Sequence, residues 1–191
     1  MAVAESDRAV AVRRALRRLV AEHGFHGTSM TAVARAAGVA TGTAYTHYAS
    51  KDELVLAAYA ETKAELAAAA MAGLDAGAEP ALRFRGMWLA IYRHMYEQPE
   101  HAVFLLQVDC SPYRVSAHEA AMRGQGDPED PILAQAARPD MAACLLALPL
   151  EVIYELGLAP AGRLAAAGTE LTGEQLNEIA SACWRAITQP A

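Results

Sequence analysis

Helix-forming residues dominate this chain from one end to the other, and this feature constrains its fold more than any other. Alanine, leucine, glutamate and arginine are abundant, runs of β-branched residues are few, and only short polar stretches interrupt the pattern. The 191 residues are 54% apolar, which is enough to bury a core in one compact unit or in two small ones. We therefore expect an all-α protein of about nine helices.

The apolar segments are too short to cross a membrane. The longest uninterrupted apolar run, Met141 to Leu150, has ten residues and contains Pro149. A transmembrane helix needs roughly 18 or more apolar residues in succession. The N-terminal segment also lacks the basic region, apolar core and cleavage site of a secretory signal peptide. We expect a cytoplasmic protein without a membrane partner.

The residue types that usually carry catalysis or bind metals are scattered. Cys110, Cys144 and Cys183 form no CxxC pair, and their ordinary role would be that of small buried apolar side chains. The six histidines form no HExxH motif and no close grouping with cysteine. Nucleophile-elbow, phosphate-loop and dinucleotide-binding motifs are also missing from the sequence. We expect no disulfide, no metal ion, no cofactor and no catalytic residue, and hence no enzyme.

The charge is distributed unevenly along the chain. Residues 1–51 carry seven basic and three acidic side chains, whereas residues 52–191 carry nine basic and 19 acidic ones. A small basic region on a larger acidic body suits a protein that touches a polyanion with one end only. Four of the basic residues, Arg13, Arg14, Arg17 and Arg18, fall on the helical arc opposite the apolar positions near them. An ordinary solvated helix face is the alternative explanation.

Local signals predict where several helices begin and end. Ser50 with Glu53, and Thr172 with Gln175, have the spacing of capping boxes, in which each side chain accepts a bond from the other residue's amide. Pro80 and Pro99 are placed to open helices. Residues 124–131 (GQGDPEDP) predict a loop. From Pro149 onward one helix is expected, kinked near Pro160.

A helix-turn-helix motif lies near the N-terminus. Ala34 is small where two helices would cross closely, Gly38 follows four residues later in the turn, and Val39 comes next. The segment Thr28–Leu54 resembles, over nearly its whole length, the DNA-binding region of the tetracycline-repressor (TetR) family. The matching positions are Thr28, Val33, Ala34, Ala37, Gly38, Val39, Gly42, Thr43, Tyr45, His47, Tyr48, Ser50 and Lys51 through Leu54.

This resemblance implies that a recognition helix at Thr41–Tyr48 enters the DNA major groove. Five side chains could donate hydrogen bonds to phosphate oxygens: Ser29, Thr43, Tyr45, His47 and Lys51. The candidates for contact with bases are Thr31, Thr41, Gly42 and Thr46. Tyr48 is expected in the core, while packing alone is the alternative for Tyr45 and plain surface exposure is the alternative for His47.

Two positions depart from the family pattern. Ala40 stands where the family often has serine, and Ala44 where a larger aliphatic residue is common, so one phosphate contact and some packing under the recognition helix are in question. The same helix lacks arginine, asparagine and glutamine, the usual bidentate readers of guanine and adenine. Threonine contacts and DNA shape would then share the sequence specificity.

The resemblance further implies a DNA-binding domain at residues 1–55 and a ligand-binding and dimerisation domain at residues 56–191. Pocket candidates, for which plain core packing is the alternative, are Phe84, Met87, Trp88, Ile91, Tyr92, Met95, Phe104, Gln107, Tyr113 and Tyr154. Possible polar anchors are His94, Asp109 and Arg114. Dimer-interface candidates, for which packing within the chain is the alternative, are Leu150, Ile153, Gly157, Ala161, Ala165, Leu176, Ile179, Cys183 and Ile187.

These features together predict a ligand-responsive transcriptional regulator. The expected partners are a palindromic double-stranded DNA operator, a second copy of the chain, and a small lipophilic or aromatic effector whose binding releases the DNA. The expected direction of control is repression. A helical protein-interaction module that has lost DNA binding is the alternative, motivated by Ala40 and Ala44.

Overall fold

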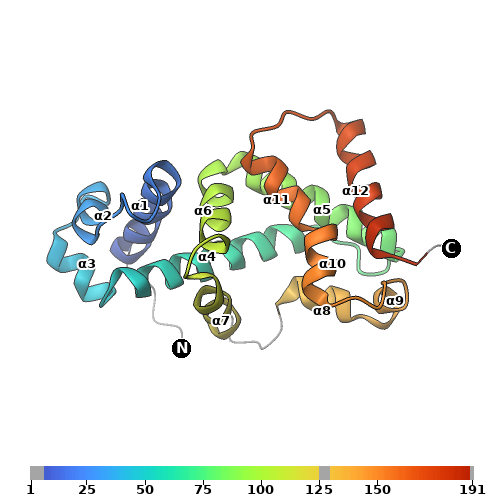
Figure 1. The fold of residues 1–191 in the computed structure, drawn as a ribbon, viewed down its shortest axis with the longest axis horizontal. Coiled ribbons are helices and arrows are strands. Elements are labelled where there is room, and N and C mark those ends of the chain that lie inside the picture. The colour runs from blue at the N-terminus through green and yellow to red at the C-terminus, as the bar shows by residue number, and fades with distance from the viewer. Residues whose placement is uncertain (1–6, 125–129, 190–191) are drawn as a thin grey trace. The chain divides into compact units, whose positions relative to one another are not determined.

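The computed structural model describes residues 7–124 and 130–189, and these residues form twelve helices and no β-strand. The all-α expectation is confirmed, although the described residues contain more helices than the nine or so expected. Figure 1 shows the helices in chain order. They are α1 (Asp7–His23), α2 (Met30–Ala36), α3 (Thr41–His47), α4 (Lys51–Met71), α5 (Pro80–Glu97), α6 (Pro99–Asp109), α7 (Arg114–Gly124), α8 (Pro131–Ala137), α9 (Pro139–Ala142), α10 (Leu150–Gly157), α11 (Ala159–Ala166) and α12 (Gly173–Ile187).

The larger number arises partly because the segment after Pro149 is two helices and not one kinked helix. α10 ends at Gly157, and the amide of Leu158 still donates to the carbonyl of Tyr154 at 3.0 Å. Pro160 then lies in the first turn of α11. Since proline lacks an amide hydrogen but tolerates the first helical turn, it begins a new helix here. The short helices α8 and α9 were not expected, and the middle of the predicted loop, residues 125–129, lies outside the described residues.

The predicted helix starts are confirmed with one difference in detail. Thr172 and Gln175 form the full capping box, and Pro80 and Pro99 open α5 and α6. At the start of α4 the Ser50 hydroxyl accepts from the Glu53 amide at 3.1 Å. The Glu53 carboxylate, however, accepts from the amide of Ala49 at 2.7 Å, one residue earlier than a capping box requires.

The chain divides into two compact units. The first comprises Met1–Ala64 and Val103–Gly126, and the second comprises Glu65–Ala102 and Asp127–Ala191. α4 and α6 therefore each contribute to both units. In the first unit the core is built from apolar side chains of α1, α2, α3 and the first half of α4, joined by Phe104 and Val108 of α6. This core places α2 and α3 side by side at the surface of α1 (Figure 1).

The second unit is organised around α5. Its buried face carries Phe84, Trp88 and Met95, which are at most 3% exposed, and α11 and α12 pack against it. Ala161 and Ala165 of α11 are almost completely buried, because small side chains let two helices approach closely. Across the part of the chain that the structure describes, no helix combines the length and apolar character that crossing a bilayer would require.

Candidate nucleic-acid interface

The turn between α2 and α3 has the geometry of a helix-turn-helix. Gly38 adopts a φ of +69°, a left-handed conformation that strains any residue with a Cβ. The amide of Val39 donates back to the carbonyl of Ala34 at 3.0 Å, and the Ala34 side chain is fully buried. Gly38 and Val39 of the sequence motif therefore form the turn, and Ala34 in α2 accepts the hydrogen bond that closes it.

α3 presents polar side chains to solvent and packs against the core through one small residue. Ala44 is fully buried, so the close approach of α3 to the core depends on a methyl group at this position. Tyr45 is 51% exposed, and the two other residues with exposed side chains or backbone on this helix are Gly42 and Thr46. Thr41, Thr43 and His47 are half-buried. The structure thus brings the α3 candidates together on one short helix.

Hydrogen bonds within the chain already use part of the hydrogen-bonding capacity of the candidate side chains. Ser29 caps α2, and its hydroxyl oxygen accepts from the Ala32 amide at 3.2 Å. The Thr46 hydroxyl donates to the carbonyl of Gly42 at 3.0 Å, which leaves its methyl group and lone pairs for a base. Thr31 is exposed on α2.

Lys51 is held by the segment between α1 and α2. Its ammonium donates to the carbonyls of Phe25 at 2.7 Å and Thr28 at 3.1 Å. An ammonium group has three N–H donors, so one is left for a phosphate. The lysine therefore also organises the loop before α2, a structural role that its place in the motif did not reveal.

Two of the four clustered arginines are buried, which corrects the expectation of a solvated or DNA-facing cluster. Arg13 and Arg17 are each 4% exposed, whereas Arg14 and Arg18 are exposed. Arg13 donates to Glu61 of α4 at 2.6 Å, and Arg17 forms a second, very short contact with the same carboxylate. The sequence pattern could not separate them, because their partner lies more than 40 residues away.

The same contacts determine the charge state of Glu61. Burial opposes ionisation, but hydrogen bonds from Arg13 and Arg17 outweigh it and lower the pKa of Glu61 below its ordinary 4.5. Arg13 also donates to the Tyr48 hydroxyl at 2.6 Å. Tyr48 is 6% exposed, in agreement with the expected core position.

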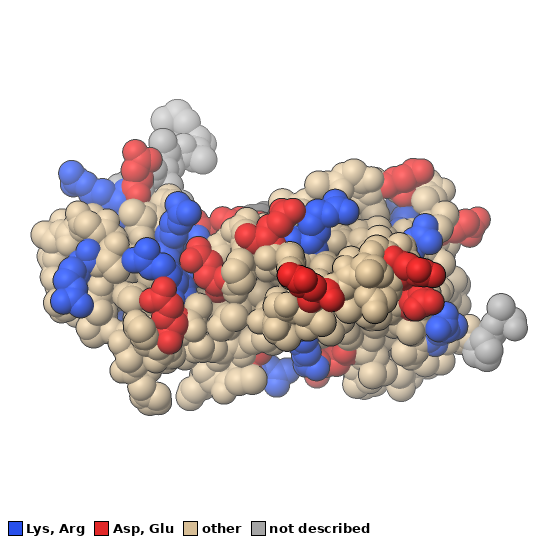
Figure 2. Space-filling view, turned by 90° about the horizontal axis from the view of Figure 1, so that it is seen from above, with Lys and Arg blue, Asp and Glu red and all other residues tan. Residues whose placement is uncertain are grey.

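The basic surface of the first unit is accordingly smaller than the residue count suggests. Arg14, Arg18 and Arg35 are exposed and available to a polyanion. Figure 2 shows blue side chains gathered at the left of the view, over the first unit, with a few red ones among them. The electrostatic attraction to DNA would come from these exposed residues and not from Arg13 or Arg17.

An apolar pocket lies within the second unit. Its walls come from α5, α8, α9, α10 and the end of α12, and they include three of the predicted pocket residues, Phe84, Met87 and Tyr154. The cavity volume is about 40 Å³, which is far less than the roughly 150 Å³ of a cavity that admits benzene. In this conformation the pocket is therefore too small to admit a molecule of that size.

The other seven pocket candidates do not line this cavity. Four of them, Trp88, Ile91, Tyr92 and Met95, are buried core residues of α5, for which plain packing was the alternative. Phe104, Gln107 and Tyr113 belong to the first unit. Burial together with a 2.6 Å hydrogen bond to Asp52 raises the pKa of Tyr113 to about 12.

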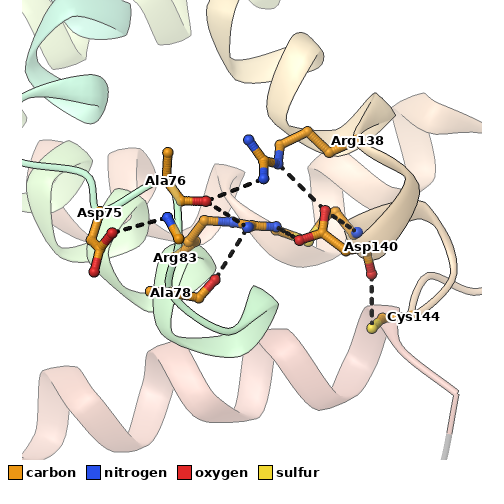
Figure 3. Close-up of polar contacts among 9 residues, drawn as sticks. Asp75, Ala76, Ala78, Arg83, Arg138, Asp140 and Cys144 are labelled. Atoms are coloured by element: carbon orange, nitrogen blue, oxygen red, sulfur yellow. Dashed lines mark hydrogen bonds and ion pairs between the residues drawn. The ribbon is translucent and has the colours of Figure 1, made fainter.

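A buried arginine beside the pocket connects two of its walls. Arg83 is 2% exposed, and its guanidinium donates to the carbonyls of Ala76 and Ala78 and to the Asp140 carboxylate at 2.7 Å (Figure 3). Arg138 donates to the carbonyl of Ala76 as well. The hydrogen bond from Arg83 lowers the pKa of Asp140. The network joins the loop before α5 to the start of α9.

Six of the nine dimer-interface candidates are buried within the chain itself. They are Ile153, Gly157, Ala161, Ala165, Cys183 and Ile187. A Cβ on Gly157 would lie 3.1 Å from Ile187 and 3.4 Å from Phe84. Leu176 and Ile179 are half-buried, and Leu150 is 48% exposed. The apolar surface of α10 includes Val152 and Leu156, which are 38% and 44% exposed and were not among the candidates.

The three cysteines also differ in how deeply they are buried. Only Cys183 is buried, whereas Cys144 is half-buried and Cys110 is exposed, and all three are free thiols. Burial raises the pKa of the Cys183 thiol. The expectation of small buried side chains is therefore correct for one of the three.

Models of known protein families match both the N-terminal and the C-terminal part of the chain. Residues 12–58 match the model of the bacterial regulatory proteins of the tetR family, and residues 81–188 match that of the tetracyclin repressor-like C-terminal domain. No curated protein sequence matches the chain.

Solved structures of the same fold span almost the whole chain. A TetR-family transcriptional regulator from Haemophilus influenzae RD is 26% identical, with a TM-score of 0.80 over 96% of this chain and 97% of that one. A regulator from Shewanella sp. PV-4 is 24% identical, with a TM-score of 0.81 over 97% and 100% of the two chains. One from Marinobacter aquaeolei VT8 is 21% identical, with a TM-score of 0.79 over 96% of each.

Proposed function

We propose that this chain, which belongs to the tetR family of bacterial regulatory proteins, is a repressor that a small-molecule effector releases from a palindromic DNA operator. The observation that carries the proposal is the polar face of α3, held at the surface of the first unit by the turn at Gly38 and by the buried Ala44. Family membership makes the chain a transcription regulator and not an enzyme.

On the DNA, α3 would lie in the major groove. Tyr45 is the most exposed aromatic residue of this helix and would donate its hydroxyl to a phosphate, together with Ser29, Thr43, His47 and the free N–H of Lys51. Thr31, Thr41 and Thr46 would contact base edges, and Gly42 would let the backbone approach them. The phosphate contacts fix the register, while the threonines and DNA shape provide specificity.

Regulation would require a dimer and a pocket that opens. Two DNA-binding domains must reach successive major-groove faces about 34 Å apart, which a two-fold dimer provides. The apolar lining of the pocket in the second unit suits a lipophilic or aromatic effector. Because the cavity of about 40 Å³ is too small for such a molecule, binding would favour a conformation with displaced walls. A differential affinity of a few kcal/mol between two dimer states is enough to release DNA.

The test is fluorescence anisotropy on a duplex taken from immediately upstream of the protein's own gene, at about 150 mM salt with excess random competitor DNA. Tyr45→Phe removes one exposed hydroxyl and is expected to weaken binding about tenfold, the loss of one charge-assisted hydrogen bond. Tyr96→Phe, on a tyrosine that is 39% exposed in the second unit, is the matched control. Absence of binding at every salt concentration would support the alternative, an interaction module that has lost DNA binding.

Effector release has its own measurement. Candidate lipophilic compounds are first screened for binding to the free protein, and DNase footprints are then recorded with and without the bound compound. An unchanged footprint in the presence of a demonstrably bound compound would refute the coupling between pocket and DNA.

A further inference from the structure

Two histidines and a glutamate, separate in the sequence, meet in the second unit. Glu65 comes from α4, His94 from the last turn of α5 and His101 from the first turn of α6. One ligand atom from each side chain lies within 4.8 Å of the other two. All three residues belong to the same compact unit, so the unit itself holds the cluster together.

The turn between α5 and α6 brings the two imidazoles together. The amide of Gln98 donates to the carbonyl of His94 at 3.1 Å, and the amide of His101 donates to the carbonyl of Gln98 at 3.0 Å. Pro99 opens α6 directly after this turn. The imidazole rings therefore lie across the turn from each other, with centroids 6.2 Å apart and planes inclined by 58°.

His101 is buried, His94 is half-buried, and the Glu65 carboxylate is partly open to solvent. The His101 side chain is 5% exposed, and its Nδ1 lies 3.4 Å from the Glu65 carboxylate, which is 41% exposed. The Nε2 atom of His94 is shielded from solvent and makes no hydrogen bond to any of the described residues. A buried polar atom without a partner is costly, and coordination of a metal ion would satisfy it.

We propose that Glu65, His94 and His101 bind one divalent transition-metal ion, with Zn²⁺ as the representative case. Two imidazoles and one carboxylate are a donor set that Zn²⁺, Co²⁺, Ni²⁺ and Cu²⁺ accept, whereas Mg²⁺ and Ca²⁺ prefer oxygen donors alone. Ligands of a tetrahedral Zn²⁺ at roughly 2.0–2.1 Å lie about 3.3 Å from each other. The His101–Glu65 separation of 3.4 Å already matches this value.

The geometry also indicates what kind of site this is. The ligand atoms lie up to 4.8 Å from one another and must come to about 3.3 Å to share one ion. A shift of about an ångström in each side chain achieves this, and the Glu65 side chain is exposed enough to move. Three protein ligands leave the fourth position of a tetrahedral ion to water or to a small molecule. The bound ion would join α4, α5 and α6 at one point of the second unit.

The experiment uses the full-length protein without a histidine tag, stripped of metal with a chelator. Titration with Co²⁺ is followed by its visible absorption, and titration with Zn²⁺ by calorimetry. We expect one ion per chain, displacement of Co²⁺ by Zn²⁺, and no competition from Mg²⁺. His94→Gln and Glu65→Gln should each weaken Zn²⁺ binding at least tenfold, because each removes one ligand.

The matched control is His23→Gln. His23 also lies beside a carboxylate, at 3.6 Å from Glu22, but both side chains are more than half exposed, so this variant should bind Zn²⁺ like the wild type. Circular dichroism verifies that each variant is folded, and Glu65→Gln, at an exposed position, serves as the test if His94→Gln fails to fold. Unchanged affinity in Glu65→Gln, or fewer than one ion per two chains, would reduce the cluster to a histidine–carboxylate ion pair. Metal binding is measured without DNA, so its failure leaves the proposed repressor function untouched.

Discussion

Glu61 compensates two buried positive charges in the first unit, and this makes its carboxylate a measurable contributor to stability. Glu61→Gln keeps the shape of the side chain but leaves Arg13 and Arg17 beside a neutral amide. We expect a loss of roughly 3 kcal/mol in the free energy of unfolding at pH 7, the scale for removing one member of a buried ion pair. Urea denaturation of the variant and the wild type measures the difference.

The same residue gives a pH dependence with a definite sign. Because folding lowers the pKa of Glu61 from 4.5, its contribution is complete above about pH 4.5 and is lost as the pH falls through the folded-state value. The stability gap between wild type and Glu61→Gln should therefore close on acidification. Glu22→Gln, at an exposed carboxylate of α1, is the control and should show almost no gap at any pH. A gap that stays constant down to about pH 2 would contradict this explanation.

Among the elements, the turn of the helix-turn-helix depends on backbone conformation and not on space. A Cβ added at Gly38 would meet no atom within 4 Å, yet φ is +69°. Gly38→Ala should therefore cost about 1 kcal/mol of stability through strain alone. Gly42→Ala, in the helical conformation of α3 and with no neighbour within 4 Å, should instead stabilise the protein by up to about 1 kcal/mol. Thermal unfolding of both variants gives the comparison, and equal melting temperatures would refute it.

The connection between the loop before α5 and α9 rests on Arg83. Arg83→Met keeps most of the side-chain length but leaves the carbonyls of Ala76 and Ala78 without this donor, so we expect a loss of roughly 3 kcal/mol. Arg85→Met replaces an exposed arginine on the same helix and should be close to neutral. Urea denaturation separates the two variants. Equal stability of both would show that the buried network contributes nothing measurable.

Helix ends were predictable from the sequence because the interactions that set them are local. Pro80, Pro99 and the Thr172–Gln175 box act within a few residues of their own position. Which element packs against a given helix face, by contrast, depends on residues that are distant in the sequence. The stripe of Ala161 and Ala165 has the same pattern whether it packs on α5 or on a second chain, and only the fold shows that α5 covers it.

The same contrast between local and long-range interactions applies to the candidate site. The polar face of α3 could be predicted because the motif fixes a short helix on a tight turn. The metal cluster could not, because His94 and His101 are seven residues apart across a helix break and Glu65 comes from another helix. Similarly, nothing near Arg13 in the sequence reveals that Glu61 covers it.

For the whole molecule, the proposed dimer needs a surface that joins two copies. Among the described residues, four of the nine large apolar side chains with high exposure lie between positions 148 and 156. Val152 and Leu156 are four residues apart and so share one side of α10. We expect the double variant Val152→Glu, Leu156→Glu to weaken dimerisation at least tenfold in analytical ultracentrifugation, because two charges would have to be buried. Val115→Glu, at an apolar side chain 68% exposed in the first unit, is the control.

The same variant separates two ways in which DNA binding could fail. If α10 joins the copies, the double variant should lose affinity for a palindromic operator but keep the wild-type affinity for an isolated half-site, because each DNA-binding domain still makes its own contacts. Tyr45→Phe should weaken binding to both the palindrome and the half-site, since it removes a contact from the DNA-binding domain itself. Equal losses on palindrome and half-site in the α10 variant would mean that the substitutions damage the fold, and an undisturbed dimer would place the interface on another surface.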